Sequence, residues 1–314
     1  MPAPRVASLL PSATEMVCAL GCEEQLVGVS HECDWPESVV GTAVLTSSKV
    51  MQSPSSGTID RDIRNVLKDA LAVYDIDEAG LARAKPDVIV TQDLCDVCAV
   101  SFEEVVEAAK KLTNPDVNIV NLRPMKLADI WDDIRKVGAA LRRDLAAEAV
   151  LTKMDARVAA VRERAAALDT RPNVLTIEWV DPPMLGGTWM PELVEIAGGR
   201  ALVTKPGDHA PTVTREQLEA LDPAPDVVVI KPCGFPLSRT IDEADTLNDL
   251  LAGLPWPALR DGAVWVADGN AYFNRPGPRI VDSLEILAAC MHPEAFADFA
   301  EQYEGAFRRF GVRT

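Results

Sequence analysis

The sequence predicts an α/β protein with two Rossmann-like lobes that are bridged by a long α-helix and enclose a ligand cleft between them. Short apolar runs alternate with helical patterns in the first 122 residues. An almost unbroken helical pattern then covers residues 127–168, and a second strand–helix series follows it. We therefore expect three segments, namely an N-terminal lobe (1–125), linking helices (126–170) and a C-terminal lobe (171–314).

The first lobe is expected to alternate strands with helices. The predicted strands are residues 6–10, 25–30, 87–91 and 118–122. The predicted helices are residues 12–20, 60–72 and 102–112, and a Ser-rich stretch over 46–58 is expected to be a loop. Ser12-Ala13-Thr14-Glu15 matches the capping box that opens a helix.

The sequence pattern also predicts the helices and strands of the linking segment and of the second lobe. The helical pattern breaks near Arg142-Arg143, and Asp144 is placed to cap a second helix that reaches about residue 168. Such a helix would be about 37 Å long at roughly 1.5 Å per residue. The second lobe is predicted to contain strands at residues 173–180, 201–204, 226–230 and 263–267. Its helices are expected from about residues 191, 215, 242 and 279.

A short internal sequence repeat supports the prediction of two related lobes. Residues 84–90 (AKPDVIV) recur as residues 224–230 (APDVVVI), each before a loop with a cysteine. In open parallel sheets, ligands bind beyond the carboxyl ends of the strands. The loops after these strands are therefore the expected binding region.

Charge and hydropathy exclude several classes of function. The formal net charge is −17, from 48 acidic and 31 basic side chains, which disfavours nucleic acid and anionic membrane surfaces as partners. No run of about 18 apolar residues is present, so no membrane insertion is expected. The first strand begins at residue 6 without room for a secretory signal before it, which predicts a cytoplasmic protein.

Four runs carry a resemblance to a known family: residues 5–15 (RVASLLPSATE), 26–29 (LVGV), 85–90 (KPDVIV) and 186–193 (GGTWMPEL). In this order they resemble the cobalamin-binding proteins of the helical-backbone (class III) periplasmic-binding, ABC-transporter substrate-binding family. The resemblance implies a corrinoid, cobalamin-like ligand held between the lobes, with Trp189 against the corrin face. It also implies transporter docking through an acid in each lobe. Glu216 resembles the second-lobe acid, but Ala79 stands where the first is expected. An intracellular carrier or sensor is therefore favoured over delivery to a transporter.

A corrinoid is a broad disc with apolar faces and an amide-rich rim, so flat aromatic surfaces and scattered polar groups suit it. Trp189 follows two glycines that would allow close backbone approach to a ligand. A core or interface role is the alternative for each aromatic residue. The expected cofactor-binding residues are Trp189, Trp179, Glu178, Trp35, Tyr272, Phe273, Pro11 and Ser12.

A cysteine–histidine constellation follows two predicted strands of the first lobe. His31 and Cys33 come after one strand, and the Cys95-x-x-Cys98 pair comes after another. Three thiolates and one imidazole would complete a zinc site, and they would equally suit iron, an iron cluster or an axial bond to haem iron or cobalt. Packing cysteines or a redox dithiol are the alternatives.

The remaining cysteines and the missing catalytic motifs bear on function as well. Cys18, Cys22 and Cys290 are expected to be core residues, and Cys233 lies on a second-lobe loop where it would pack or cap the ligand. Neither a phosphate-binding glycine loop nor a Gly-x-Ser-x-Gly elbow is present. Binding is therefore favoured over catalysis. The alternatives left open are a metal-ion, haem or iron-cluster binding protein and an enzyme with a cofactor in the cleft.

Overall fold

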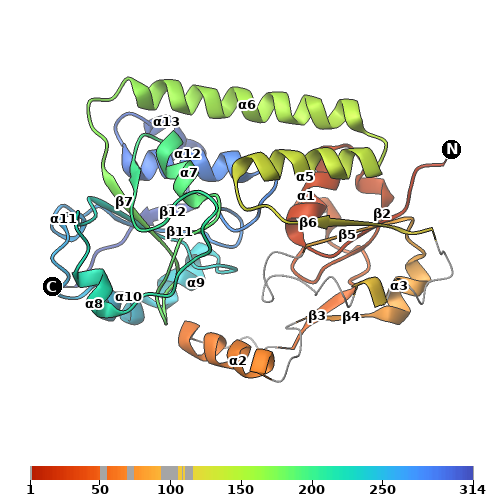
Figure 1. The fold of residues 1–314 in the computed structure, drawn as a ribbon, viewed down its shortest axis with the longest axis horizontal. Helices are drawn as coiled ribbons and strands as arrows, with labels where there is room; N and C mark the ends of the chain where they lie inside the picture. The colour runs from red at the N-terminus through yellow and green to blue at the C-terminus, as the bar shows by residue number, and fades with distance from the viewer. Residues whose placement is uncertain are drawn as a thin grey trace. The chain divides into compact units, whose positions relative to one another are not determined.

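The computed structural model describes residues 2–49, 55–68, 74–92, 105–107, 109 and 116–313. The chain divides into two compact units. Unit 1 comprises Met1–Ser53, Arg61–Pro124 and Ala128–Lys153, and unit 2 comprises Pro54–Asp60, Met125–Leu127 and Met154–Thr314. Each unit has its own sheet and helices (Figure 1), which confirms the predicted α/β class.

In the described part of unit 1, parallel strands form a sheet in the order β2-β1-β5-β6. Their bounds are β1 (Val6–Ser8), β2 (Leu26–Val29), β5 (Val88–Gln92) and β6 (Asn118–Leu122). Every residue of β1 and β5 is buried, as the apolar runs predicted. Helices α1 (Pro11–Ala19) and α5 (Leu127–Ala140) lie on one side of this sheet (Figure 1).

Local details of unit 1 differ from the sequence prediction. The predicted capping box does not start α1, because its N-cap is Leu10 with no side-chain hydrogen bond and Pro11 is the first helical residue. The Thr14 hydroxyl donates to Ser8 Oγ instead, at 2.8 Å. The predicted 46–58 loop contains strand β3 (Thr46–Ser48), which pairs with β4 (Tyr74–Ile76), and the start of helix α2 (Ser56–Lys68). Helix α3 (Glu78–Ala84) lies between β4 and β5. Most of the predicted 102–112 helix lies outside the described residues.

Two helices occupy the segment over residues 127–168 that was predicted to be helical. Helix α5 ends at Ala140, Arg142 takes a left-handed φ of 59°, and α6 (Asp144–Ala166) begins at the predicted residue. The break at residues 142–143 is therefore a turn between two helices.

In the described part of unit 2, the sheet order is β12-β11-β10-β7-β8, and β9 also pairs with β7. The strands are β7 (Asn173–Trp179), β8 (Met184–Leu185), β9 (Arg200–Ala201), β10 (Val227–Ile230), β11 (Val264–Ala267) and β12 (Phe307–Arg309). The β7, β10 and β11 strands run parallel, so their carboxyl ends share one edge.

The helices of unit 2 cover both faces of this sheet (Figure 1). They are α7 (Met190–Ile196), α8 (Arg215–Glu219), α9 (Leu237–Asp242), α10 (Ala244–Leu251), α11 (Pro257–Arg260), α12 (Ile280–Met291) and α13 (Ala297–Gln302). Helix α12 is the central one, because it contacts α7, α13 and β10 and all its residues except Asp282 are buried. None of the described helices is both long and apolar enough to cross a lipid bilayer.

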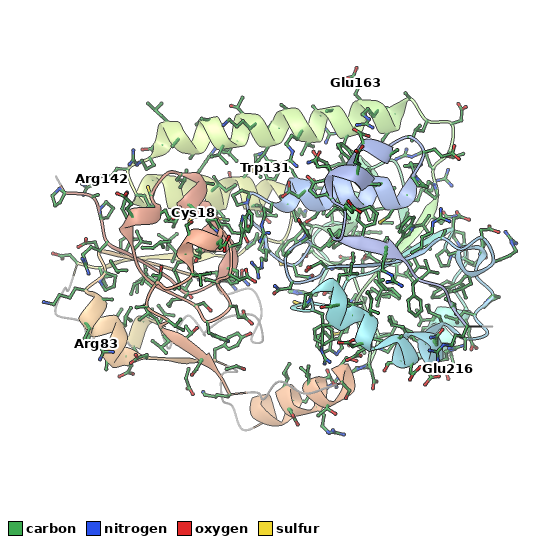
Figure 2. All side chains as sticks on the ribbon, turned by 180° about the vertical axis from the view of Figure 1, so that it is seen from behind. Cys18, Arg83, Trp131, Arg142, Glu163 and Glu216 are labelled. Carbon is green, nitrogen blue, oxygen red and sulfur yellow. The ribbon has the colours of Figure 1, made fainter. Side chains whose placement is uncertain are left out.

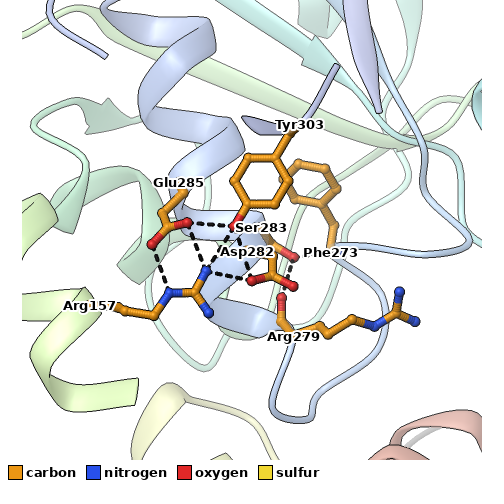
Figure 3. Close-up of polar contacts among 7 residues, drawn as sticks. All are labelled: Arg157, Phe273, Arg279, Asp282, Ser283, Glu285 and Tyr303. Carbon is orange, nitrogen blue, oxygen red and sulfur yellow. Dashed lines mark hydrogen bonds and ion pairs between the residues drawn. The ribbon is translucent and has the colours of Figure 1, made fainter. Parts of the chain in front are cut away.

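A polar cluster ties the second half of α6 to α12 (Figure 3). Arg157 donates to both oxygens of Glu285, at 2.9 and 2.7 Å, and to Asp282 at 2.5 Å. The Tyr303 hydroxyl donates to Glu285 at 2.5 Å. Burial, together with the neighbouring carboxylates, raises the pKa of Tyr303, so its hydroxyl stays a hydrogen-bond donor.

Replacing Arg157 with leucine should lower the free energy of unfolding by about 2 kcal/mol, because it leaves largely buried carboxylates without their cation. Urea unfolding measures the change. Arg162→Leu is the matched control, since Arg162 is an exposed arginine on the same helix. We expect it to change stability by less than about 0.5 kcal/mol. Equal effects of the two variants would show that the cluster does not stabilise unit 2.

Candidate functional site

The carboxyl edge of the unit 2 sheet gathers aromatic and charged side chains. Glu178 and Trp179 end β7, Lys231 follows β10, and the loop over residues 268–279 follows β11. Parallel strands bring these segments together although they are far apart in the sequence. This edge is therefore the candidate ligand site within unit 2.

An aromatic pair forms one part of this site. The rings of Trp179 and Phe235 lie 5.2 Å apart between centroids, at an interplanar angle of 59°. The Trp179 indole N–H donates to the Asp181 carbonyl at 3.0 Å, which fixes the orientation of the ring. The guanidinium of Arg239 lies 4.7 Å from the centroid of the Phe235 ring. Trp179 is partly exposed, so it offers a ligand an apolar surface in a fixed orientation.

A buried lysine, Lys231, forms an ion pair with Glu178, the carboxylate of the site. The Lys231 side chain is 0% exposed, and its Nζ donates to Glu178 Oε2 and Asn274 Oδ1, each at 3.0 Å. Asn274 donates in turn to the backbone carbonyls of Lys231 and Gly269. The Glu178 side chain remains 21% exposed. The network therefore keeps a carboxylate in place at the site edge, where it can accept hydrogen bonds from a ligand.

The loop after β11 is ordered by its own polar contacts. Asp268 Oδ1 accepts hydrogen bonds from the backbone N–H groups of Asn270 and Ala271, at 2.9 and 2.7 Å. Tyr272, which is partly exposed, packs edge-on against Tyr303 at a centroid distance of 6.1 Å. The Arg279 guanidinium lies 5.6 Å from the centroid of the Tyr272 ring. Tyr272 is thus held beside the site by neighbours from the same unit.

The expectation that Trp189 offers an open stacking surface is wrong. Its side chain is buried, with only 5% of the residue exposed, and its indole N–H donates to the Phe273 carbonyl at 2.8 Å. Phe273 is 0% exposed, so it is a core residue as well. The preceding glycines serve packing instead of ligand approach. A Cβ on Gly186 would lie 2.2 Å from Thr176 Oγ1, and one on Gly187 would lie 2.5 Å from the backbone nitrogen of Ala210.

The unit 1 candidates are placed in different environments. Trp35 is 49% exposed, and Pro11 is partly exposed as the first residue of α1. Ser12 is buried, with 2% exposure, which leaves it little surface for a ligand contact. Of this group, Trp35 and Pro11 keep surface that a ligand can reach.

The predicted metal cluster is only partly within the described residues, because Cys95 and Cys98 lie outside them. Among the residues that the structure describes, no group of three His, Cys, Asp or Glu side chains is arranged to hold a metal ion. His31 Nδ1 lies 2.7 Å from Thr46 Oγ1, and Cys33 Sγ lies 3.1 Å from Thr14 Oγ1. Burial, with Glu23 and Glu15 nearby, raises the pKa of Cys18 to about 12, so this α1 thiol (Figure 2) is protonated at neutral pH.

The comparison with protein families decides the identity of the fold. A family model described as "Periplasmic binding protein" matches residues 6–271. The chain belongs to this family.

Individual relatives are distant but cover nearly the whole chain. The uncharacterised ABC transporter substrate-binding lipoprotein YvrC of Bacillus subtilis (strain 168) is 19% identical over 300 residues, which are 94% of this chain and 82% of the relative. A periplasmic heme-binding protein from Pseudomonas aeruginosa is 23% identical with a TM-score of 0.69, covering 93% of this chain and 94% of that one. The periplasmic vitamin B12 binding protein BtuF of Vibrio cholerae is 19% identical with a TM-score of 0.63, covering 94% and 98%. These likenesses establish the class III fold.

The expected cytoplasmic location, and with it the intracellular carrier or sensor, is wrong. The family is periplasmic or extracytoplasmic, and the Bacillus subtilis relative is a lipoprotein. The position of the first strand in the chain therefore carries no information on location.

Glu216, the predicted docking acid, lies on the surface of unit 2 in the first turn of α8 (Figure 2). A hydrogen bond from the Thr214 side chain lowers the pKa of its carboxyl group, so Glu216 is ionised at neutral pH. Its contact with a transporter stays a prediction.

Proposed function

We propose that this periplasmic binding protein binds a corrinoid at the carboxyl edge of the unit 2 sheet and presents it to an ABC transporter. The observation that carries the proposal is the Trp179–Phe235 pair beside a carboxylate that a buried lysine holds in place. An apolar ring surface next to a fixed hydrogen-bond acceptor suits a flat macrocycle with an amide-bearing rim. The vitamin B12 binding protein of the same fold supports this class of ligand.

Electrostatics favour a corrinoid over haem at this edge. The charge of Lys231 is already neutralised by Glu178, so the pair offers no free cation to a ligand carboxylate, whereas the exposed surface of Glu178 accepts amide N–H groups. Haem carries propionate carboxylates on its rim, whereas a corrinoid carries amides. The net charge of −17 adds to the repulsion of an anionic ligand.

Haem is the second candidate, favoured by Tyr272. A phenol is a known type of axial ligand to haem iron, and the nearby Arg279 guanidinium would pair with a propionate. The heme-binding relatives of the same fold support this alternative.

The experiment that tests the proposal is gel filtration of the purified protein after incubation with hydroxocobalamin or, separately, with haemin. We expect the visible absorbance of hydroxocobalamin to co-elute with the protein at one ligand per chain. Co-elution of haemin alone would replace the corrinoid with haem as the ligand. A colourless protein peak in both experiments would contradict a tetrapyrrole-type ligand altogether.

A further inference from the structure

The first residues of α2 are bound to unit 2. Residues 55–60, which we call the strap, begin with Ser55 and include the first helical residue, Ser56. The Ser56 backbone N–H and hydroxyl each donate to an oxygen of Glu243, at 2.5 Å. Ser56 is 0% exposed and Glu243 is 5% exposed. The strap is therefore docked through a buried hydrogen-bonded carboxylate that follows α9.

Elementary helix chemistry explains why this docking is favourable. The first N–H groups of a helix have no partner within the helix, and its N-terminus attracts negative charge. Ser55 caps α2 from within the strap, since its Oγ accepts a hydrogen bond from the Thr58 N–H at 3.3 Å. Glu243 supplies a second acceptor from elsewhere in the chain and satisfies the Ser56 N–H. If the strap undocked, the Ser56 N–H and hydroxyl and the Glu243 carboxylate would lose these hydrogen bonds and would need water as a replacement partner.

The strap also packs on the loop that carries Trp179. A Cβ on Gly57 would lie 2.1 Å from Asp181 Oδ2, so only a residue without a side chain fits here unless the carboxylate moves. The carbonyl of the same Asp181 accepts the indole hydrogen bond of Trp179. Gly57 therefore presses directly against the segment that orients the aromatic pair.

A second set of contacts links the strap to Phe235. The Glu243 carboxylate lies 3.6 Å from the guanidinium of Arg239, and that guanidinium lies 4.7 Å from the centroid of the Phe235 ring. Phe235 in turn contacts Trp179. The strap thus supports each ring of the pair by a separate route within unit 2.

We propose that the strap positions the Trp179–Phe235 pair for ligand binding, so that strap docking and ligand binding strengthen each other. The ligand half of this inference rests on the proposed function. Coupling between two binding events is reciprocal: if docking improves ligand affinity, the ligand stabilises docking by the same factor. When the strap already holds the Trp179–Phe235 pair in place, the pair loses less conformational freedom on ligand binding. This smaller entropy loss is the source of the higher ligand affinity.

The test combines hydrogen exchange of the strap with the affinity for hydroxocobalamin. Glu243→Gln removes the charge and one of the acceptor oxygens. Gly57→Val introduces a side chain that clashes with Asp181 and so weakens docking of the strap. Asp242→Asn is the matched control, because this neighbouring acid is exposed and makes the same change of charge. Gly57→Val leaves Glu243 unchanged, which keeps the test valid if Glu243→Gln fails to fold.

Without ligand, we expect fast exchange of the Ser56 amide in Glu243→Gln and Gly57→Val and slow exchange in the wild type and in Asp242→Asn. We expect the dissociation constant for hydroxocobalamin to rise about tenfold in the first two variants and to stay unchanged in the control. In the wild type, ligand should slow strap exchange further. Docking without any ligand effect would overturn the strap proposal and leave the proposed function standing. Absence of tetrapyrrole binding in the wild type would overturn both.

Discussion

Replacing Lys231 with methionine is expected to lower the free energy of unfolding by about 3 kcal/mol, the largest stability loss that we predict for a single site in unit 2. Methionine fills a similar volume, so the loss comes from the missing charge and hydrogen bonds and not from a cavity. Glu178 loses its cation and Asn274 loses a donor within a largely buried network. Because Glu178 is partly exposed, we expect a loss of unfolding free energy at the lower end of the range for breaking a buried ion pair.

Urea unfolding of a double-mutant cycle checks this expectation. Adding Glu178→Gln to Lys231→Met should recover about half of the lost stability, because the unpaired carboxylate is then gone. Lys205→Met, at an exposed lysine of the same unit, should change stability by less than about 0.5 kcal/mol. Additive effects of Lys231→Met and Glu178→Gln would mean that the two side chains do not stabilise each other.

Replacing Trp179 with alanine should weaken hydroxocobalamin binding about 30-fold, equivalent to about 2 kcal/mol for an aromatic anchor. The ring is partly exposed, so its removal takes away a ligand surface more than it disturbs the core. It also leaves Phe235 without its aromatic neighbour. The dissociation constant from equilibrium dialysis is the relevant measurement, with the urea midpoint as a check on folding.

Trp179→Phe is the matched control for this variant. Phenylalanine keeps a flat ring but lacks the N–H that donates to the Asp181 carbonyl. We expect it to retain most of the affinity, with a loss of about threefold. An alanine variant that binds as tightly as the wild type would remove Trp179 from the site.

The sequence predicted well those features that depend on local pattern. Buried β-branched runs such as Val227–Ile230 are strands because each residue is apolar and the run is too short for a helix. The turn at residues 142–143 was predicted from a break in helical periodicity. Glu178 and Trp179 lie at the end of a strand that the sequence predicted over residues 173–180, and the parallel β7, β10 and β11 strands share the edge at which this strand ends.

The features that failed depend on contacts between distant residues. Lys231 directly follows an apolar strand, and its burial is possible only because Glu178 of β7 and Asn274 of the loop after β11 approach it. Trp189 was misread because paired glycines suggest close approach to a ligand, whereas here the Thr176 side chain approaches Gly186 and the backbone of residues 208–210 approaches Gly187. Docking of Ser56 on Glu243 joins residues 187 positions apart, and no local pattern predicts it.

The most direct test is hydrogen exchange of the wild type with and without saturating hydroxocobalamin. If unit 2 holds the ligand at its carboxyl edge, exchange should slow at residues 178–183, 231–236 and 268–274 together. These segments are far apart in the sequence and come together at that edge of the sheet. Bound ligand with unchanged exchange in all three segments would contradict the assignment of the site.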